Sequence, residues 1–198
     1  MRQLLASGLI DPVRGAEIEY AGYLPDWHPY EDYRQSYAAR AELGGGVVLT
    51  HIHDYDLAWW LFGAPQAVLA SGGRESALEI DVEDTVRAEL TTPAGRVFVS
   101  QSFASKSSAR RIVVHGSVGT VTVDLIAATL DLDASLGPGL RMDNYPRNAM
   151  FRDEVTHFLE CVDHGMEPKS PLSDGVAVLR VALAVKESMR SGTRVELR

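Results

Sequence analysis

The sequence predicts an α+β fold, in which an open, mainly antiparallel β-sheet of about six strands is covered on one face by three helices. Two observations predict it. Residues 66–134 hold strand-like segments in direct succession, with no helical segment between them, and strands that follow one another in this way pair antiparallel. The turn signals PAG at 93–95 and GSVG at 116–119 separate some of these segments, as expected for hairpins.

The chain before this region predicts a helix, a strand and a loop. Residues 2–8 (RQLLASG) end in glycine and are typical of the last turns of a helix. Residues 13–24 alternate between apolar and polar side chains, which predicts a strand. Prolines interrupt residues 25–37, an aromatic and charged segment that we interpret as a loop. Residues 38–43 have room for one helical turn.

Residues 47–62 (VVLTHIHDYDLAWWLF) predict a helix. The run is long for a strand, and Gly63 followed by Pro65 is a typical helix end. The strand segments of the sheet region are then 66–73, 84–93, 96–104, 110–116, 119–126 and 128–134.

The C-terminal third predicts a loop at 137–147, helices at 148–164 and 173–190, and a closing strand at 194–197. Helical spacing places one set of apolar residues of each helix on one face, which we expect to turn toward the core. The two sets are Phe151, Val155, Phe158, Leu159 and Val162, and Val176, Leu179, Leu183 and Val185.

Composition narrows the class of protein. The 198 residues suit a single domain spanning 1–198. A net charge of −8, with 27 acidic against 19 basic residues, argues against nucleic-acid binding, which needs clustered Lys and Arg. No apolar run approaches the ~20 residues of a membrane span. The single Cys161 excludes an intrachain disulfide and is expected to be buried. We therefore expect a cytoplasmic protein without a membrane partner.

The stretch THIHDYD at 50–56 has the composition of a metal site, with two histidines and two aspartates in six residues. In a strand, His51 and His53 would share a face and could hold one ion. In a helix they lie about 200° apart and cannot. The helix predicted for 47–62 therefore argues against a metal centre, and a metal-dependent hydrolase is only the third functional hypothesis.

On a helix, Thr50, His53 and Asp56 follow one another along one face, and Asp54 lies toward solvent. Glycines 44–46 permit a ligand or a neighbouring element to approach the backbone just before this helix. A histidine at such a position is a candidate proton-transfer group. The alternative is a histidine that only caps the helix or packs against it.

The same stretch resembles a known family. GGGVVLTHIHDYDLAWWLFG is similar to the motif of the glucose–fructose oxidoreductase/inositol dehydrogenase/rhizopine-catabolism (Gfo/Idh/MocA) family, matching at Gly44, Gly45, Gly46, Leu49, His53, Asp56, Trp60, Leu61 and Gly63. Residues 150–197 are similar to the family's ending of helix, G-x-x-P turn, helix and strand. Residues 23–37 resemble a subgroup associated with nucleotide-sugar and surface-sugar metabolism. The resemblance covers nearly the whole chain.

The resemblance implies an NAD(P)-dependent enzyme of two domains, in which a Rossmann domain binds NAD or NADP and an α+β domain supplies the substrate pocket. The α+β domain has the open sheet of the C-terminal domains of dihydrodipicolinate-reductase-like and glyceraldehyde-phosphate-dehydrogenase-like proteins. This sequence has neither the glycine-rich fingerprint nor the lysine motif of the first domain. We therefore expect the C-terminal domain alone, catalytically incomplete, with no cofactor bound to this chain and a homodimer or larger oligomer formed through the open sheet face.

The resemblance assigns the acid/base or orienting role to His53, with Thr50 where the family usually has aspartate, which favours the lysine of the absent domain as the partner of His53. The expected substrate is a sugar or nucleotide sugar. Its binding wall is predicted to be Trp27, His28, Tyr30, Arg34 and Tyr37, with Asn144, Tyr145 and Arg147 reaching the same pocket. The alternative from a different class is a truncated, non-catalytic binding or dimerisation module.

Overall fold

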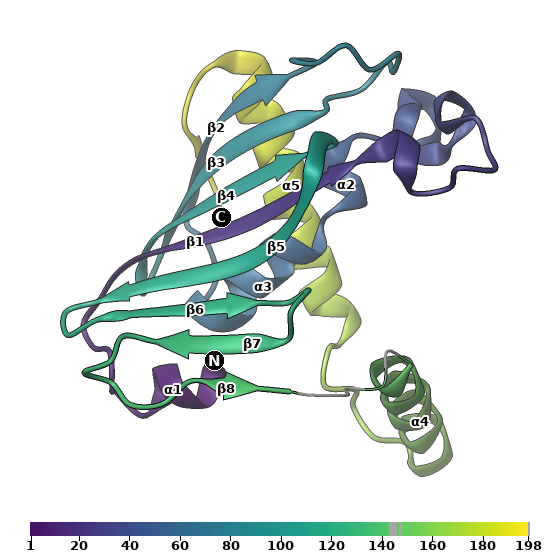
Figure 1. Ribbon diagram of the computed structural model, residues 1–198. Helices are drawn as coiled ribbons and strands as arrows, with labels where there is room; N and C mark the ends of the chain where they lie inside the picture. The colour runs from purple at the N-terminus through teal and green to yellow at the C-terminus, as the bar shows by residue number, and fades with distance from the viewer. Residues whose placement is uncertain (143–145, 147, 198) are drawn as a thin grey trace.

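The computed structural model describes residues 1–142, 146 and 148–197. A twisted sheet forms one layer, and α2, α3 and α5 lie behind it (Figure 1). The strands are β1 Val13–Tyr23, β2 Ala67–Gly73, β3 Thr85–Thr92, β4 Gly95–Ser102, β5 Ala104–Gly116, β6 Thr120–Asp124, β7 Thr129–Leu132, β8 Leu140–Arg141 and β9 Val195–Glu196. The helices are α1 Arg2–Ala6, α2 Val47–Thr50, α3 His53–Phe62, α4 Ala149–His164 and α5 Leu172–Ser191. Short 3₁₀ turns occupy Leu24–Asp26, Tyr33–Gln35, Tyr37–Ala39 and Ala41–Leu43.

The sheet has nine strands in the order β8-β7-β6-β5-β1-β4-β3-β2-β9, so the expectation of about six strands was wrong. The six segments between 66 and 134 form the meander. β1 inserts in its middle, parallel to β4 and antiparallel to β5, with Ile18 opposite both Val99 and Ile112. β8 and β9 extend the two edges, β8 within the segment predicted to be a loop. The prediction of a mainly antiparallel α+β sheet is confirmed, because β1–β4 is the only parallel pair among the described strands.

The core lies between the sheet and the helices behind it. Alternate residues of each central strand face these helices, as Val86, Ala88 and Leu90 do in β3. From the helices, the buried side chains are Val47, Val48, Tyr55, Ala58, Phe62, Val178, Val181, Ala182 and Val185. This packing holds α2 and α3 against β1, β3 and β4, and so fixes the position of the histidine motif.

Helix α4 departs from the prediction. It lies beside the sheet rather than on it (Figure 1). The five residues expected to face the core are all exposed, namely Phe151, Val155, Phe158, Leu159 and Val162. Cys161 is buried as expected, with the His157 imidazole within 3.6 Å of its sulfur. Helical spacing correctly gave the residues that share a face, but spacing does not say what covers that face.

Helix α5 packs on the sheet in a phase that differs from the prediction. Val185 is buried as expected, whereas Val176, Leu179 and Leu183 are exposed. The buried face includes Ala182, Ala184 and Ser188 instead. These small side chains let the helix come close to β2, where the Ser188 hydroxyl accepts a hydrogen bond from the Ala70 N–H at 2.9 Å. In the described part of the chain, no helix is long and apolar enough to cross a membrane.

Candidate functional site

The predicted helix at 47–62 is interrupted once, at the first histidine. α2 ends at Thr50, His51 has φ −107° and ψ 39°, and α3 begins at His53. The hydrogen bonds run nearly continuously across the break, since the amides of Thr50 and His51 donate to the carbonyls of Gly46 and Val47. The helical prediction therefore holds in outline, and the two histidines take different directions from the break.

His51 points into an aromatic cluster. Its ring stacks on Tyr20 with centroids 3.3 Å apart and planes 21° apart, and it meets the edges of Trp27 and Phe103 at 5.5 and 5.9 Å. Neither ring nitrogen has a hydrogen-bond partner among the described residues. Burial, with smaller contributions from the positive charges of Arg110 and His53, lowers the pKa of His51 to about 3. His51 is therefore a neutral, packed side chain at physiological pH, and not a metal ligand paired with His53.

Replacing His51 with phenylalanine is expected to remove part of the acid sensitivity of folding. The folded pKa is about 3 against a usual value of 6.5. As the pH falls below 6.5, the unfolded chain binds a proton that the folded chain does not. The free energy of unfolding then falls by up to about 1.4 kcal/mol per pH unit until the pH reaches the folded pKa. We expect the free energy of unfolding, measured with urea, to fall between about pH 8 and about pH 5. The fall should be about 1–2 kcal/mol smaller for His51→Phe than for the natural protein.

The control for this change is His115→Phe, which removes a half-buried histidine on the open face and leaves His51 in place. Asp54 acts in the opposite sense, because burial raises its pKa and the folded state then binds its proton first as the pH falls. Asp54 is present in all three proteins, so the comparison isolates His51. Equal losses of stability in the natural protein and His51→Phe would show that His51 titrates normally in the fold.

His53 has the opposite environment. It is the first residue of α3 and its side chain is exposed. Thr50, at the end of α2, has a buried hydroxyl that lacks a hydrogen-bond partner in the described part of the chain. Among the described residues, no three His, Cys, Asp or Glu side chains lie close enough together to hold a metal ion. The motif therefore presents one accessible imidazole, His53, whereas the Thr50 hydroxyl is buried.

The space beside the glycines before the motif is occupied by other parts of the protein. A Cβ on Gly45 would overlap the carbonyl oxygens of Tyr37, Ala38 and Arg40, and one on Gly46 would overlap the Glu83 carboxylate. The N–H groups of residues 44–47 already donate to backbone carbonyls. A dinucleotide cradle needs free N–H groups for its phosphates. The glycines thus admit a neighbouring element rather than a ligand, and they do not fit NAD(P).

A buried polar network fixes the turn between the two helices. The Gln101 amide donates to the His51 carbonyl at 2.7 Å and to the Asp54 carboxylate at 2.9 Å, and its oxygen accepts from the Tyr55 hydroxyl at 2.9 Å. Asp54 is only 1% exposed, so its prediction as a solvent-side residue was wrong. The buried carboxylate is stabilised by a hydrogen bond from the side-chain amide of Gln101 on β4, which lies 47 residues further along the chain.

The predicted sugar wall is only partly assembled. Trp27 is half-buried and packs on Tyr20, His51 and Phe103. His28 and Tyr30 contact each other at 3.2 Å and are exposed, as is Tyr37. Arg34 is held by Asp32 and Glu79 in ion pairs of 2.8 and 2.7 Å. The remaining three predicted wall residues, Asn144, Tyr145 and Arg147, lie outside the described residues. Trp27 is therefore the one predicted wall residue that contacts the aromatic cluster around His51.

A hollow of about 320 Å³ lies next to Trp27. Its lining adds residues that sequence reasoning missed, chiefly Tyr20, Lys106 and Arg110. Burial raises the pKa of Tyr20 to about 12, and the charge of Asp54 adds to this effect, so the phenol stays protonated and able to donate. The sequence did carry a signal for Arg110, because strand alternation places it on the same face as the buried Ile112 and Val114.

Comparison with known proteins identifies the fold. Residues 2–197 match the Gfo/Idh/MocA family description "Oxidoreductase family, C-terminal alpha/beta domain". The chain belongs to the Gfo/Idh/MocA oxidoreductase family. The match covers the C-terminal domain of the family, as the sequence resemblance predicted. Within this family domain, the hollow lies where the end of β1 meets β5, and its Trp27 contacts His51, two residues before His53.

Solved structures of Gfo/Idh/MocA oxidoreductases share this architecture. The aldose–aldose oxidoreductase from Caulobacter crescentus, complexed with glycerol, is 25% identical with a TM-score of 0.80, over 98% of this chain and 58% of that one. The WlbA dehydrogenase from Bordetella pertussis, in complex with NADH and UDP-GlcNAcA, is 18% identical with a TM-score of 0.75, over 100% and 59%. A levoglucosan dehydrogenase, in complex with NADH and L-sorbose, is 16% identical with a TM-score of 0.80, over 100% and 62%.

At these identities the latter two relatives show the fold alone. The chain spans about three fifths of the length of each of the three proteins. A comparison with curated proteins finds no match.

Proposed function

We propose that this chain is the substrate-binding domain of an NAD(P)-dependent oxidoreductase that acts on a hydroxyl group of a sugar or nucleotide sugar in the cytoplasm. The observation that carries the proposal is an aromatic hollow whose Trp27 contacts His51, two residues before the exposed imidazole of His53. Family membership supports the reaction class. Two of the relatives are an aldose–aldose oxidoreductase and a levoglucosan dehydrogenase, which supports the substrate class.

Oxidation of a secondary alcohol releases a proton from the hydroxyl and a hydride from its carbon. In this proposal His53 accepts the proton, because its imidazole is exposed to an incoming substrate. Trp27 and Tyr20 supply a flat wall and a phenol donor for the sugar. The hydride requires NAD(P) as its acceptor. The glycine run of this chain does not fit that cofactor, so we assign substrate orientation and proton transfer to this chain.

The experiment that tests this proposal is a turnover assay of the complete gene product with NAD⁺ and NADP⁺ against a panel of aldoses, sugar acids and nucleotide sugars. We expect reduction of the dinucleotide with at least one sugar. We also expect no heat of binding when NAD(P)H is titrated into the 198-residue chain alone, because the N–H groups of its glycine run are occupied. Absence of turnover across the panel, or tight NAD(P)H binding to the isolated chain, would contradict the proposal.

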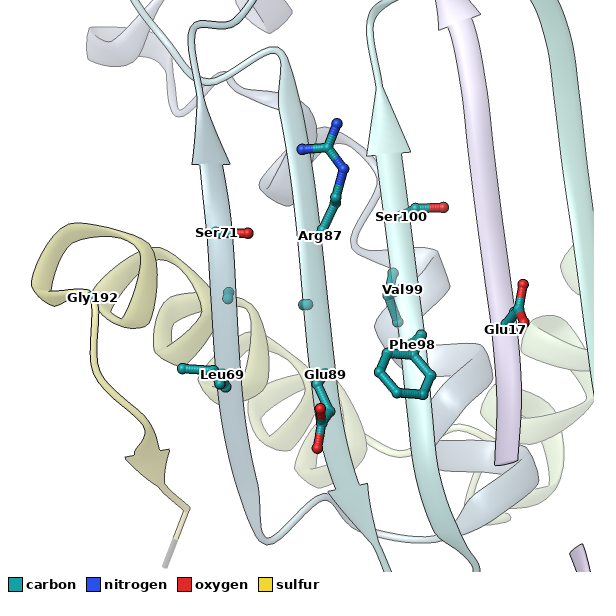
Figure 2. Close-up of a pocket in the computed structure, with 11 residues that line it drawn as sticks. Glu17, Leu69, Ser71, Arg87, Glu89, Phe98, Val99, Ser100 and Gly192 are labelled. Carbon is teal, nitrogen blue, oxygen red and sulfur yellow. The ribbon is translucent and has the colours of Figure 1, made fainter. Parts of the chain in front are cut away.

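We further propose that the open face of the sheet joins two copies of the chain. A shallow hollow of about 570 Å³ lies across β2, β3, β4 and β1. Leu69 and Phe98 are 45% and 46% exposed there, with Arg87, Glu89 and Glu17 around them (Figure 2). Two exposed apolar side chains inside a ring of both charges form a self-complementary surface, the kind that a two-fold dimer uses.

Phe98→Glu is expected to convert the dimer into a monomer. The substitution places a carboxylate beside Glu89, Glu17 and the partner's apolar patch, so that like charges meet across the two-fold axis. Sedimentation velocity of the natural chain and the variant measures the change. Leu43→Glu is the matched control, because Leu43 is 54% exposed and lies in the 3₁₀ turn Ala41–Leu43, away from this face. A natural chain that sediments as a monomer at all concentrations would refute this interface.

A further inference from the structure

Arg110 is the feature of the hollow that the proposed function leaves unexplained. It lies on β5 opposite Tyr20 of β1, with its side chain on the face of the sheet that carries the helices. The side chain is half-buried, and its Nε is fully buried. In the described part of the chain, it makes neither a hydrogen bond nor a salt bridge. A partly buried guanidinium without a partner is costly, since its desolvation is not repaid.

The next residue along the strand shows the usual arrangement. Arg111 points to the opposite face, is exposed, and pairs with Asp124 at 3.4 Å. Asp54 lies close enough to Arg110 for the arginine to oppose the rise in the pKa of Asp54, yet the two form no salt bridge. The Asp54 carboxylate is instead bound by Gln101. Arg110 therefore lies near one acid, Asp54, but its Nε donates to no hydrogen-bond acceptor among the described residues.

The hollow in front of Arg110 is predominantly cationic. Two basic residues line it, Lys106 and Arg110, against one acid, Asp26. The Lys106 ammonium lies 5.5 Å from the Tyr23 ring centroid, a cation–π contact that leaves its N–H groups available. Trp27 and Tyr20 form the aromatic side of the same space. At about 320 Å³, the hollow has the size of a small ligand pocket, for which volumes begin at roughly 300 Å³.

We propose that this hollow binds an acidic sugar, with Arg110 anchoring its carboxylate or phosphate and Trp27 and Tyr20 lying against its ring. The inference rests on the proposed function and narrows its substrate class from sugars in general to sugars that carry an anionic group. A guanidinium offers planar paired donors that match a carboxylate or phosphate. Lys106 adds a second positive charge, and the neutral Tyr20 phenol adds a donor.

The experiment is a ¹⁵N NMR titration of the 198-residue chain, following the Arg110 Nε–H and the Trp27 indole N–H. The four ligands are glucuronate, glucose 1-phosphate, glucose and inorganic phosphate. Both acidic sugars are expected to shift the two side-chain signals, with at least tenfold tighter binding than glucose or phosphate alone. Tighter binding of glucuronate would identify a carboxylate as the anionic group, and tighter binding of glucose 1-phosphate would identify a phosphate.

The variants are Arg110→Gln, which removes the charge, and Arg111→Gln, the neighbouring control on the opposite face. A charge-assisted hydrogen bond is worth about 1.5–3 kcal/mol, so Arg110→Gln should weaken acidic-sugar binding by roughly 10–100-fold. Arg111→Gln should leave it unchanged. Arg110→Lys, which keeps the charge and loses the paired donors, should give an intermediate affinity and serves if the glutamine variant does not fold.

Three results would overturn the inference: glucose binding as tightly as glucuronate, phosphate alone binding as tightly as the acidic sugars, or the natural chain showing no shift at the Arg110 Nε–H. These results differ from failure of the proposed function. If the complete gene product oxidises neutral sugars only, the proposed function stands and the anionic class is wrong. If it oxidises no sugar, the proposed function itself fails.

Discussion

His53→Ala in the complete gene product is expected to lower turnover by about 10²–10⁴-fold, the range observed for loss of a general acid or base. The side chain is exposed at the start of α3 and is not part of the buried network that holds the turn. Its loss should therefore leave the thermal midpoint nearly unchanged. Steady-state kinetics with the best sugar substrate, together with thermal unfolding, measure the two effects separately.

The matched control is His115→Ala, which removes a histidine from the open face and should retain full turnover. A His53→Ala enzyme with near-normal turnover would exclude the proton-transfer role.

Gln101→Leu is expected to lower the free energy of unfolding by about 2–4 kcal/mol. The substitution removes three hydrogen bonds at once and leaves the Asp54 carboxylate and the Tyr55 hydroxyl buried without their partner. A buried polar group without a partner costs more than the hydrogen bond itself was worth. Urea unfolding monitored by tryptophan fluorescence measures the loss.

The control for this variant is Ser100→Ala, one position away on β4 and exposed on the open face. It should change stability by no more than about 0.5 kcal/mol. If Gln101→Leu also lost no more than about 0.5 kcal/mol, water rather than Gln101 would satisfy the buried Asp54 carboxylate. The network also orients the His51–His53 turn, so the unstable variant should bind sugar more weakly as well.

The sequence predicted the local elements well because their signals are local. Alternation in β3 and the two turn signals locate the hairpins, and the resemblance at Gly44–Gly46, His53 and Asp56 located the motif. The place of β1 in the sheet could not be derived in this way, because the pairing of Ile18 with Val99 joins residues far apart in the chain. The strand count was too low for the same reason.

The errors at the site have one common cause, which is that burial depends on distant partners. Asp54 was expected to face solvent. Its spacing of seven from the buried Val47 placed it inward, and Gln101 makes that position tolerable. Arg110 was not among the predicted site residues, although strand alternation set it apart from Arg111. In both cases periodicity indicated which side chain points inward.

The central claim is that the 198-residue chain by itself forms the sugar-binding half of the site, around Trp27 and His53. The most direct test is a sugar titration of the chain, with chemical-shift changes mapped over all its amides. The account predicts that the changes concentrate at residues 20–27, 50–53 and 106–110. Changes confined to the open face at β2–β4, or none at all with any sugar that the complete gene product oxidises, would contradict it.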